Sequence, residues 1–306
     1  MALGSRSLAR RFATSADRLR LALGAGCIPK ATGQSGEDAF FACLALSGFG
    51  LADGVGGWSQ RGVDAGRFSR ALLRSAHSRM RSRARALQRA DLPGVAGEAF
   101  QAVRAERVEG SSTLLLGQLQ QDVMSLLNVG DCGVLVLRPM EQLPRFHGGT
   151  VTTQMRQLYR STPMLLRRNL PLQLSCEDRD LTSLHNHFDL VTLKLRKGDM
   201  LIAGTDGLFD NVGDMELKSM ALAHHQDAGR ERSAQALADL LLSRASDAAR
   251  SPPEFGPGGK LDDIAIIVAE VQNGSPAAQG TLLANTAGIP RERFGLGWLQ
   301  GKCEAV

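Results

Sequence analysis

The chain has 306 residues, of which 43% are apolar and 22% are charged, so it can bury one sizeable core or two small ones. Its five cysteines are odd in number, scattered and without a C-x-x-C pair, which argues against a disulfide framework and a zinc site. No window reaches about 18 consecutive apolar residues, which argues against a membrane-spanning helix.

The first 30 residues carry the basic excess of the whole chain, whose net charge is +5. They hold six basic residues and one acid, Asp17, and they are also rich in serine. Leu8 and Phe12 fall on one helical face, and "RRFATS" resembles a mitochondrial processing site near Phe12. We therefore expect an organelle transit peptide over residues 1–30, directed to the mitochondrial matrix, with a plastid as second choice. The plainer alternative is a disordered basic tail.

Short apolar runs rich in strand-forming residues recur along the chain. Most are bounded by Gly, Asp or Asn, and many are close enough in sequence to pair as hairpins. They lie at 39–46, 113–119, 123–129, 133–137, 188–195, 199–205 and 263–271.

Residues 64–90 predict an amphipathic helix, because Phe68, Leu72 and Ala76 begin an apolar stripe at helical spacing. Its eight arginines could suggest nucleic-acid binding. No aromatic residues interleave with them, however, and the chain after residue 30 is near neutral, so a solvated basic face is favoured. Further helices are predicted at 94–106, 213–225 and 232–248. Clustered strands with inserted helices favour an α+β domain, most simply a β-sandwich flanked by helices.

Aspartates recur where an apolar strand ends or begins and a glycine is close by. They are Asp53, Asp131, Asp206, Asp262 and Asp263. Carboxylates are hard oxygen donors that suit Mg²⁺ or Mn²⁺, and glycine lets the backbone approach an ion closely. Converging carboxylates would repel one another unless cations neutralised them. The pattern therefore predicts a binuclear metal site, although any single Asp-Gly is also a turn signal.

The motifs "GEDA", "ADGVGGW", "GSST", "NVGDCG", "GTDGLFDN" and "GGKLDDIAIIV" carry a family resemblance. In order and spacing, residues 33–272 resemble the metal-dependent type 2C (PPM) Ser/Thr protein phosphatases. The variants "ADGVGGW" and "TDGLFDN" resemble the branch of the mitochondrial T-cell-activation phosphatase homologue. The resemblance implies two antiparallel sheets flanked by helices on both sides (αββα), with the metal site at one edge. We expect a transit peptide at 1–30, a phosphatase domain at 31–272 and a C-terminal extension of unknown role at 273–306.

The resemblance also assigns site residues by motif position. The implied metal ligands are Asp53, which would bridge both ions, the Gly54 carbonyl, Asp206 and Asp262. The acids matching those that orient metal-bound water are Glu37 and Asp38, and Asp131 matches, with Asp206, the place of a weaker third ion. The implied cofactors are two Mg²⁺ or Mn²⁺ ions. The implied reaction is hydrolysis of phosphoserine and phosphothreonine in proteins by a bridging hydroxide, without a protein nucleophile.

Two positions depart from the better-known members of that family. Val55 stands where they carry a histidine that is a candidate general acid, and only Lys30 lies near the place of their phosphate-binding arginine. We expect slower turnover from these changes, not a different reaction. A weakly active or inactive phosphatase-like protein that serves as an interaction module, through the basic helix or the tail after 272, is the alternative.

Other chemistry is less well supported by the sequence. Cys132 has no phosphate-cradling loop beside it and is expected to pack in the core. A haloacid-type phosphatase is excluded because Gly204 stands where its nucleophilic aspartate would be. The histidines are expected on the surface or in loops, not at a metal: His185, His187, His224 and His225. The expected partners are phosphoprotein substrates, without nucleic acid or a membrane span, and the oligomeric state is left open.

Overall fold

The computed structural model describes residues 18–31, 36–86, 91–143, 150–167, 170–178, 188–227 and 233–274, and the backbone of 282–284. Its first sheet has the strand order β1 (Leu19–Ile28), β14 (Ile264–Asn273), β13 (Met200–Gly204), β7 (Gly133–Gln142) and β8 (Thr152–Arg160). The second has the order β12 (Asp189–Lys194), β6 (Val123–Val129), β5 (Leu114–Gln120), β3 (Gly48–Ala52), β2 (Ala39–Cys43) and β15 (Leu282–Ala284). All neighbouring strands in both sheets are antiparallel.

Two short strand pairs lie outside the main sheets. They are β10 (Leu170–Pro171) with β9 (Leu165–Arg167), and β11 (Leu174–Ser175) with β4 (Ser111–Ser112). The second pair is the more important for the site, because β4 carries the "GSST" motif against which the loop after β3 packs.

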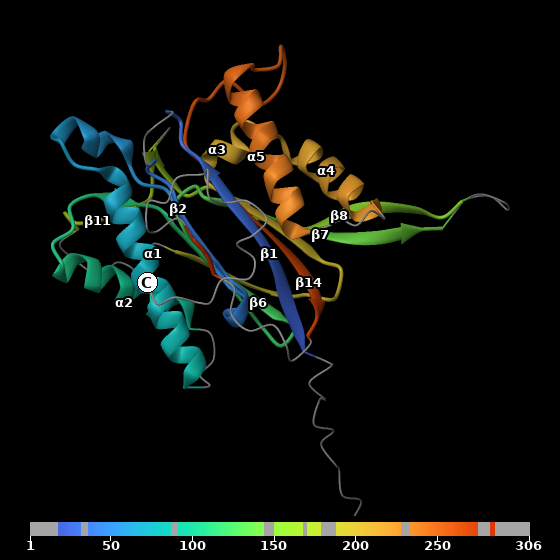
Figure 1. The fold of residues 1–306 in the computed structure, drawn as a ribbon, viewed down its shortest axis with the longest axis horizontal. Coiled ribbons are helices and arrows are strands. Elements are labelled where there is room, and N and C mark those ends of the chain that lie inside the picture. Colours follow the sequence, from blue (N-terminus) through green and yellow to red (C-terminus); the bar gives the residue numbers. More distant parts are fainter. Residues whose placement is uncertain are drawn as a thin grey trace, which may run out of the picture.

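Helices cover the outer face of each sheet, which gives four layers (Figure 1). Helices α1 (Ala65–Arg85) and α2 (Leu92–Ala105) pack on the second sheet, and α4 (Asp214–Gln226) and α5 (Ala234–Arg250) pack on the first. A further core lies between the two sheets. The predicted α+β sandwich is therefore confirmed.

The sandwich explains why its strands read as continuous apolar runs. Successive side chains of a strand point to opposite faces, and here both faces are buried. Phe40 contributes to the core between the sheets, whereas its neighbour Phe41 contributes to the core under α1 and α2. Each is at most 2% exposed.

Helix α1 begins where the Asp64 side chain accepts a hydrogen bond from the backbone of Gly66 at 3.0 Å. The predicted apolar stripe is buried against the second sheet. Part of the basic face is not free in solvent, since Arg83 pairs with Asp91 at 2.5 Å and with Glu98 of α2 at 2.6 Å. Arg83 thus helps to join the two helices.

The structure revises the boundary expected at residue 30. Residues 19–28 form β1, which pairs with β14 over its whole length and buries Leu21 to 1% exposure. This strand is therefore part of the described domain, although the expected transit peptide ran to residue 30. Residues 1–17, with the sequence features of a targeting peptide, lie outside the described residues.

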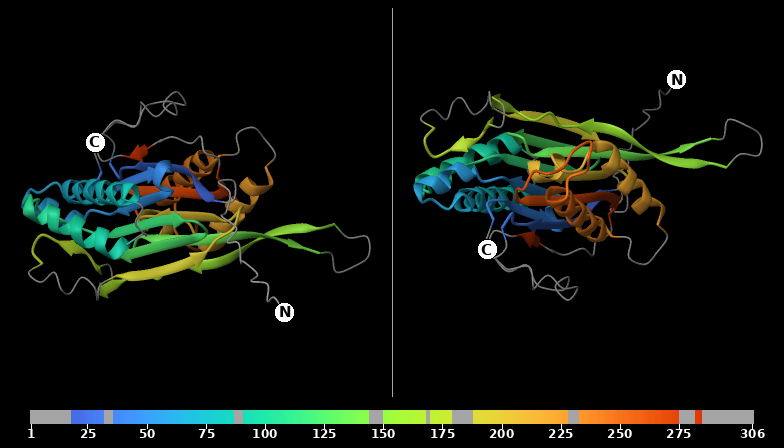
Figure 2. Two further views of the ribbon diagram at one scale, coloured as in Figure 1. Left: turned by 90° about the horizontal axis from the view of Figure 1, so that it is seen from below. Right: turned by 90° about the horizontal axis from the view of Figure 1, so that it is seen from above.

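The segment expected to be an extension at 273–306 also contributes to the fold. Its residues 282–284 form β15, which pairs with β2 at the edge of the second sheet. In the part of the chain that the structure describes, no helix is long and apolar enough to cross a membrane. Strands β7 and β8 continue as a two-stranded ribbon beyond the rest of the first sheet (Figure 2).

The position of β1 predicts different outcomes for two truncations. A protein that starts at residue 18 should keep cooperative thermal unfolding with a midpoint within a few degrees of the full chain. A protein that starts at residue 31 loses the β1–β14 ladder and the burial of Leu21, and should lose about 5 kcal/mol or more of its free energy of unfolding. Urea unfolding followed by circular dichroism measures both, and equal stability of the two truncated proteins would contradict the assignment.

Candidate metal centre

The predicted acids come from the same end of both sheets. Asp38 precedes β2 and Asp53 follows β3, and these strands pair so that Ala39 faces Ala52. Asp206 follows β13 and Asp262 lies two residues before β14, the neighbouring strand of the first sheet. Asp131 lies in the link between β6 of the second sheet and β7 of the first.

Asp53 is held in place by the "GSST" strand. Its backbone amide donates to the Thr113 hydroxyl at 2.9 Å, and its carbonyl accepts from the Thr113 amide at 3.0 Å and from the Ser112 hydroxyl at 2.8 Å. The loop that follows is fixed as well, because the Trp58 indole donates to Ser111 Oγ at 2.6 Å. Three hydrogen bonds thus fix the backbone of Asp53, and none of the three involves its carboxylate.

Gly54 occupies a position that has no room for a side chain. A Cβ atom there would lie 2.7 Å from the carbonyl oxygens of Ala65 and Glu37. The Gly54 amide donates to the Glu37 carbonyl at 3.2 Å, and the Ser69 hydroxyl donates to the same carbonyl at 2.6 Å. This close approach joins the motif after β3 to the paired acids before β2.

The paired acids have different surroundings. Asp38 is 1% exposed and its Oδ2 accepts a hydrogen bond from the Thr205 hydroxyl at 2.7 Å. Glu37 turns its carboxylate toward Lys30, whose Nζ lies 2.5 Å from Oε2. Asp263 is a scaffold residue, because its buried carboxylate accepts the backbone amide of Lys30 at 2.6 Å and that of Glu37.

Electrostatics indicate that the acids form one cluster. Burial and the charges of Asp38 and Asp206 raise the pKa of Asp53 well above its ordinary value. Asp262 and Asp131 add to the same shift. Burial and the charge of Asp263 raise the pKa of Asp38 in the same way, and burial and the charge of Asp206 raise the pKa of Asp131 to about 6. The site therefore resists carrying its full negative charge unless cations neutralise it.

The donor set fits a hard divalent cation. It consists of carboxylate oxygens, with Oδ1 of Asp131 and Oδ1 of Asp206 buried and without a hydrogen-bond partner among the described residues. Within the described ranges, however, no three His, Cys, Asp or Glu side chains lie close enough to form a ready set of metal ligands. The number of ions and the roles of the individual ligands thus remain predictions.

Two lysines supply positive charge to the cluster, and the sequence did not assign a role to one of them. Lys260 contacts Asp206, lies 2.7 Å from Asp210 and is 3.6 Å from Asp262. Lys30 approaches the other Asp262 oxygen to 4.0 Å. The only sequence signals for Lys260 and Asp210 were their places within the "GGKLDD" and "GLFDN" motifs.

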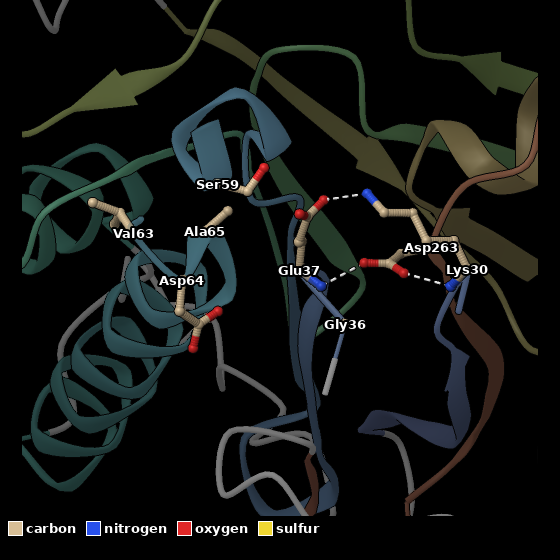
Figure 3. A pocket seen from close by; sticks show the side chains of 8 residues that line it. All are labelled: Lys30, Gly36, Glu37, Ser59, Val63, Asp64, Ala65 and Asp263. Carbon is tan, nitrogen blue, oxygen red and sulfur yellow. Dashed lines mark hydrogen bonds and ion pairs between the residues drawn. The ribbon is translucent and has the colours of Figure 1, made fainter. Parts of the chain in front are cut away.

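A pocket of about 360 Å³ lies beside the acids (Figure 3). Lys30, Glu37 and Asp263 form one wall, and Ser59 with residues 63–65 forms the other. The Lys30 side chain points along this pocket to Glu37, so it can meet an anionic group that enters there. Of the acids discussed above, Glu37 and Asp263 line this pocket.

Cys132 and the histidines do not form a second reactive centre among the residues that the structure describes. Cys132 is 1% exposed, and burial, with the charge of Asp53, raises the pKa of its thiol, as expected for a core residue. His185 and His187 lie outside the described residues. His224 corrects the expectation of a surface histidine: its side chain is 8% exposed and its Nε2 lies 2.9 Å from Glu270.

Comparisons with known proteins place the chain in a family. The family model described as Stage II sporulation protein E (SpoIIE) matches residues 48–272. "Probable protein phosphatase 2C 26" of Arabidopsis thaliana is 31% identical over 277 residues, which cover 83% of this chain and 84% of that protein. "Probable protein phosphatase 2C BIPP2C1" of Oryza sativa subsp. japonica is 31% identical over 273 residues, which cover 83% of this chain and 43% of that protein. The chain spans about half the length of the first curated relatives that it matches, from 43% to 54%.

Solved structures share the fold. The photosystem II phosphatase PBCP has a TM-score of 0.62 and 28% identity, covering 83% of this chain and all of that one. The catalytic domain of the serine threonine protein phosphatase PstP, solved with 2 manganese ions, has a TM-score of 0.55 and 18% identity, covering 83% of this chain and 99% of that one. The second likeness concerns the fold alone.

The cradle around Gly54 predicts that Gly54→Ala disrupts the site. The added methyl group would press on two backbone carbonyls, so we expect a loss of about 1–3 kcal/mol in the free energy of unfolding. Gly57→Ala is the matched control, because a Cβ at Gly57 meets no atom within 4 Å. Thermal and urea unfolding of the two variants measures the difference, and similar behaviour would show that the close approach at Gly54 is not required.

Proposed function

Since the chain belongs to the protein phosphatase 2C family, we propose that it is a Mg²⁺- or Mn²⁺-dependent protein serine/threonine phosphatase. The observation that carries this proposal is the cluster of buried carboxylates at one end of the sandwich, with raised pKa values and unpartnered oxygen atoms. The neighbouring pocket, which is lined by Lys30 and Glu37, would receive the phosphorylated serine or threonine of a protein substrate.

The cations would be held by Asp53, the Gly54 carbonyl, Asp206 and Asp262. Asp53 would be shared between two ions. The two manganese ions bound to the catalytic domain of PstP, which has the same fold, support this number. Asp131, whose Oδ1 is buried without a partner among the described residues, would help to hold a weaker third ion. When bound, the cations supply a hydroxide near neutral pH and neutralise the phosphoryl oxygens.

The chain's own residues bind and orient the reactants. Lys30 faces the pocket and can bind a phosphoryl oxygen, although a lysine offers a point charge where an arginine would offer a bidentate contact. Glu37 and Asp38 would accept hydrogen bonds from water and fix its direction. Val55 has no proton to give, so the alkoxide that leaves must take its proton from water. Slower turnover follows from both features.

An interaction module without phosphatase activity is the alternative function. The acids expected to hold the metals are all present and gathered in one cluster, and this favours the enzyme. Part of the arginine face of α1, the surface such a module could use, is already paired with acids at α2. The two functions differ in one measurable property, which is metal-dependent turnover.

The central prediction is that Asp53→Asn abolishes metal-dependent phosphatase activity. The change removes one negative charge from the position proposed to lie between two divalent cations. Turnover of an aryl phosphate with Mn²⁺ should fall by about 10²-fold or more, equal to several kcal/mol at about 1.36 kcal/mol per decade. The fold should persist, because one source of carboxylate repulsion is lost.

Asp247→Asn on α5 is the control, since it removes the same charge from an exposed position far along the chain from Asp53. It should keep the activity of the parent. Activity that survives a chelator, or an Asp53→Asn protein with normal turnover and Mn²⁺ affinity, would place the reaction elsewhere.

We also propose a mitochondrial location, with a plastid as the alternative. The basic, serine-rich composition of residues 1–17 supports targeting, and the first described strand, β1, begins after them at Leu19. The likeness to a photosystem II phosphatase supports the plastid as second choice. A fluorescent protein fused behind residues 1–17 should enter mitochondria, and retention in the cytosol would contradict both locations.

A further inference from the structure

Lys260 lies among three carboxylates of the acid cluster. Its ammonium group contacts Asp206, lies 2.7 Å from Asp210 and lies 3.6 Å from Asp262. Asp206 and Asp262 are the residues that would hold a metal ion in the proposed function, whereas Asp210 has no such role. The same ammonium group therefore contacts both the expected metal ligands and a carboxylate outside them.

The backbone of Lys260 is fixed independently of its side chain. The Asn211 side chain, which is 1% exposed, donates to the Lys260 carbonyl at 2.9 Å and accepts from the Lys260 amide at 3.1 Å. A third hydrogen bond, from the Asn211 side chain to the Gly207 carbonyl at 2.9 Å, ties Asn211 to α3 (Asp206–Phe209). The four-carbon stem of Lys260 can thus move from a stationary backbone.

We propose that the Lys260 ammonium group is a built-in counter-ion that competes with the divalent cation for Asp206 and Asp262 and withdraws to Asp210 when the cation binds. This inference rests on the metal site of the proposed function. It assigns to Lys260 the role of setting the cation concentration at which that site fills.

Charge and exposure support this exchange. An ammonium group and a divalent cation on the same carboxylate repel each other strongly in a partly buried site, so one must leave as the other arrives. The Asp206 side chain is 17% exposed and the Asp210 side chain is 50% exposed, so Asp210 offers a position nearer the solvent. Moving there exchanges a buried contact for an exposed one and keeps the ammonium group paired.

Lys30 does not have the same arrangement. Its close partner is Glu37. Of the two proposed metal ligands that Lys260 approaches, Lys30 comes near Asp262, to 4.0 Å. No contact joins it to Asp206 among those that the described residues make. Lys260 is thus the lysine placed to hold the cluster together when metal is scarce.

The test compares Lys260→Met with the parent protein by two measurements. Titration calorimetry with Mn²⁺ should give a dissociation constant about tenfold lower for Lys260→Met, because the competing charge is gone. With a chelator present, the melting temperature of Lys260→Met should fall below that of the parent, because the carboxylates lose their counter-ion. Lys260→Arg, which keeps the charge, should stay closer to the parent in both measurements.

Two further variants make the test specific. Asp210→Asn should weaken Mn²⁺ binding several-fold, since the displaced ammonium group loses the carboxylate to which it withdraws. Lys194→Met removes the same charge from a lysine that is 81% exposed on β12 and paired with Asp122, and it should leave Mn²⁺ affinity unchanged.

The outcomes separate this inference from the proposed function. Mn²⁺ binding that is equal in the parent and Lys260→Met, or weaker in the variant, overturns the counter-ion role and leaves the metal site in place. A parent protein that binds no Mn²⁺ overturns both. Tighter binding in Lys260→Met together with weaker binding in Asp210→Asn supports the exchange of the ammonium group between the two carboxylates.

Discussion

Repulsion among buried carboxylates is the constraint around which this end of the molecule is organised. Each acid near Asp53 raises the pKa of its neighbours, since charges in a poorly solvated site interact more strongly than they do in water. The fold offsets this cost locally. A hydroxyl hydrogen bond supports Asp38, two backbone amides support Asp263, and Lys30 and Lys260 lie at the two sides of Asp262. In the part of the chain that the structure describes, Asp131 and Asp206 each keep a buried oxygen without a hydrogen-bond partner, and the proposed cations would bind there.

The sandwich makes this cluster possible because antiparallel strands bring sequence-distant ends together. Asp38 and Asp53 are neighbours through the β2–β3 hairpin, and Asp206 and Asp262 through the β13–β14 pair. The inter-sheet core then holds the two pairs at one end of the molecule. Gly54 lets the backbone of one motif meet that of the other, and the buried threonine and serine of the "GSST" strand fix the result.

Strand β1 connects the stability of the domain to its chemistry. It forms an edge of the first sheet, packs against α5 and leads directly to Lys30, which lies on the pocket beside the acids. The segment therefore contributes burial through Leu21 and a positive charge through Lys30. A protein that lacked both β1 and Lys30 would lose an element of the fold and the lysine that lines the pocket at the same time.

Sequence patterns were enough to predict the sandwich, its main helices and the identity of the clustered acids. Helix α1 and strand β6 were predictable because burial imposes a local pattern on each of them. The pattern is an apolar stripe in the helix and a short β-rich run in the strand. Strand β1 was not, because its arginine and small residues resemble the basic segment before it, and only pairing with β14 distinguishes them. Strand β8 was not predicted either, because its sequence is polar and only its pairing with β7 shows that it is a strand. The contacts of Lys260 with Asp206 and Asp210 were decided by tertiary structure alone, because they join residues about 50 positions apart through a loop whose path no local pattern specifies.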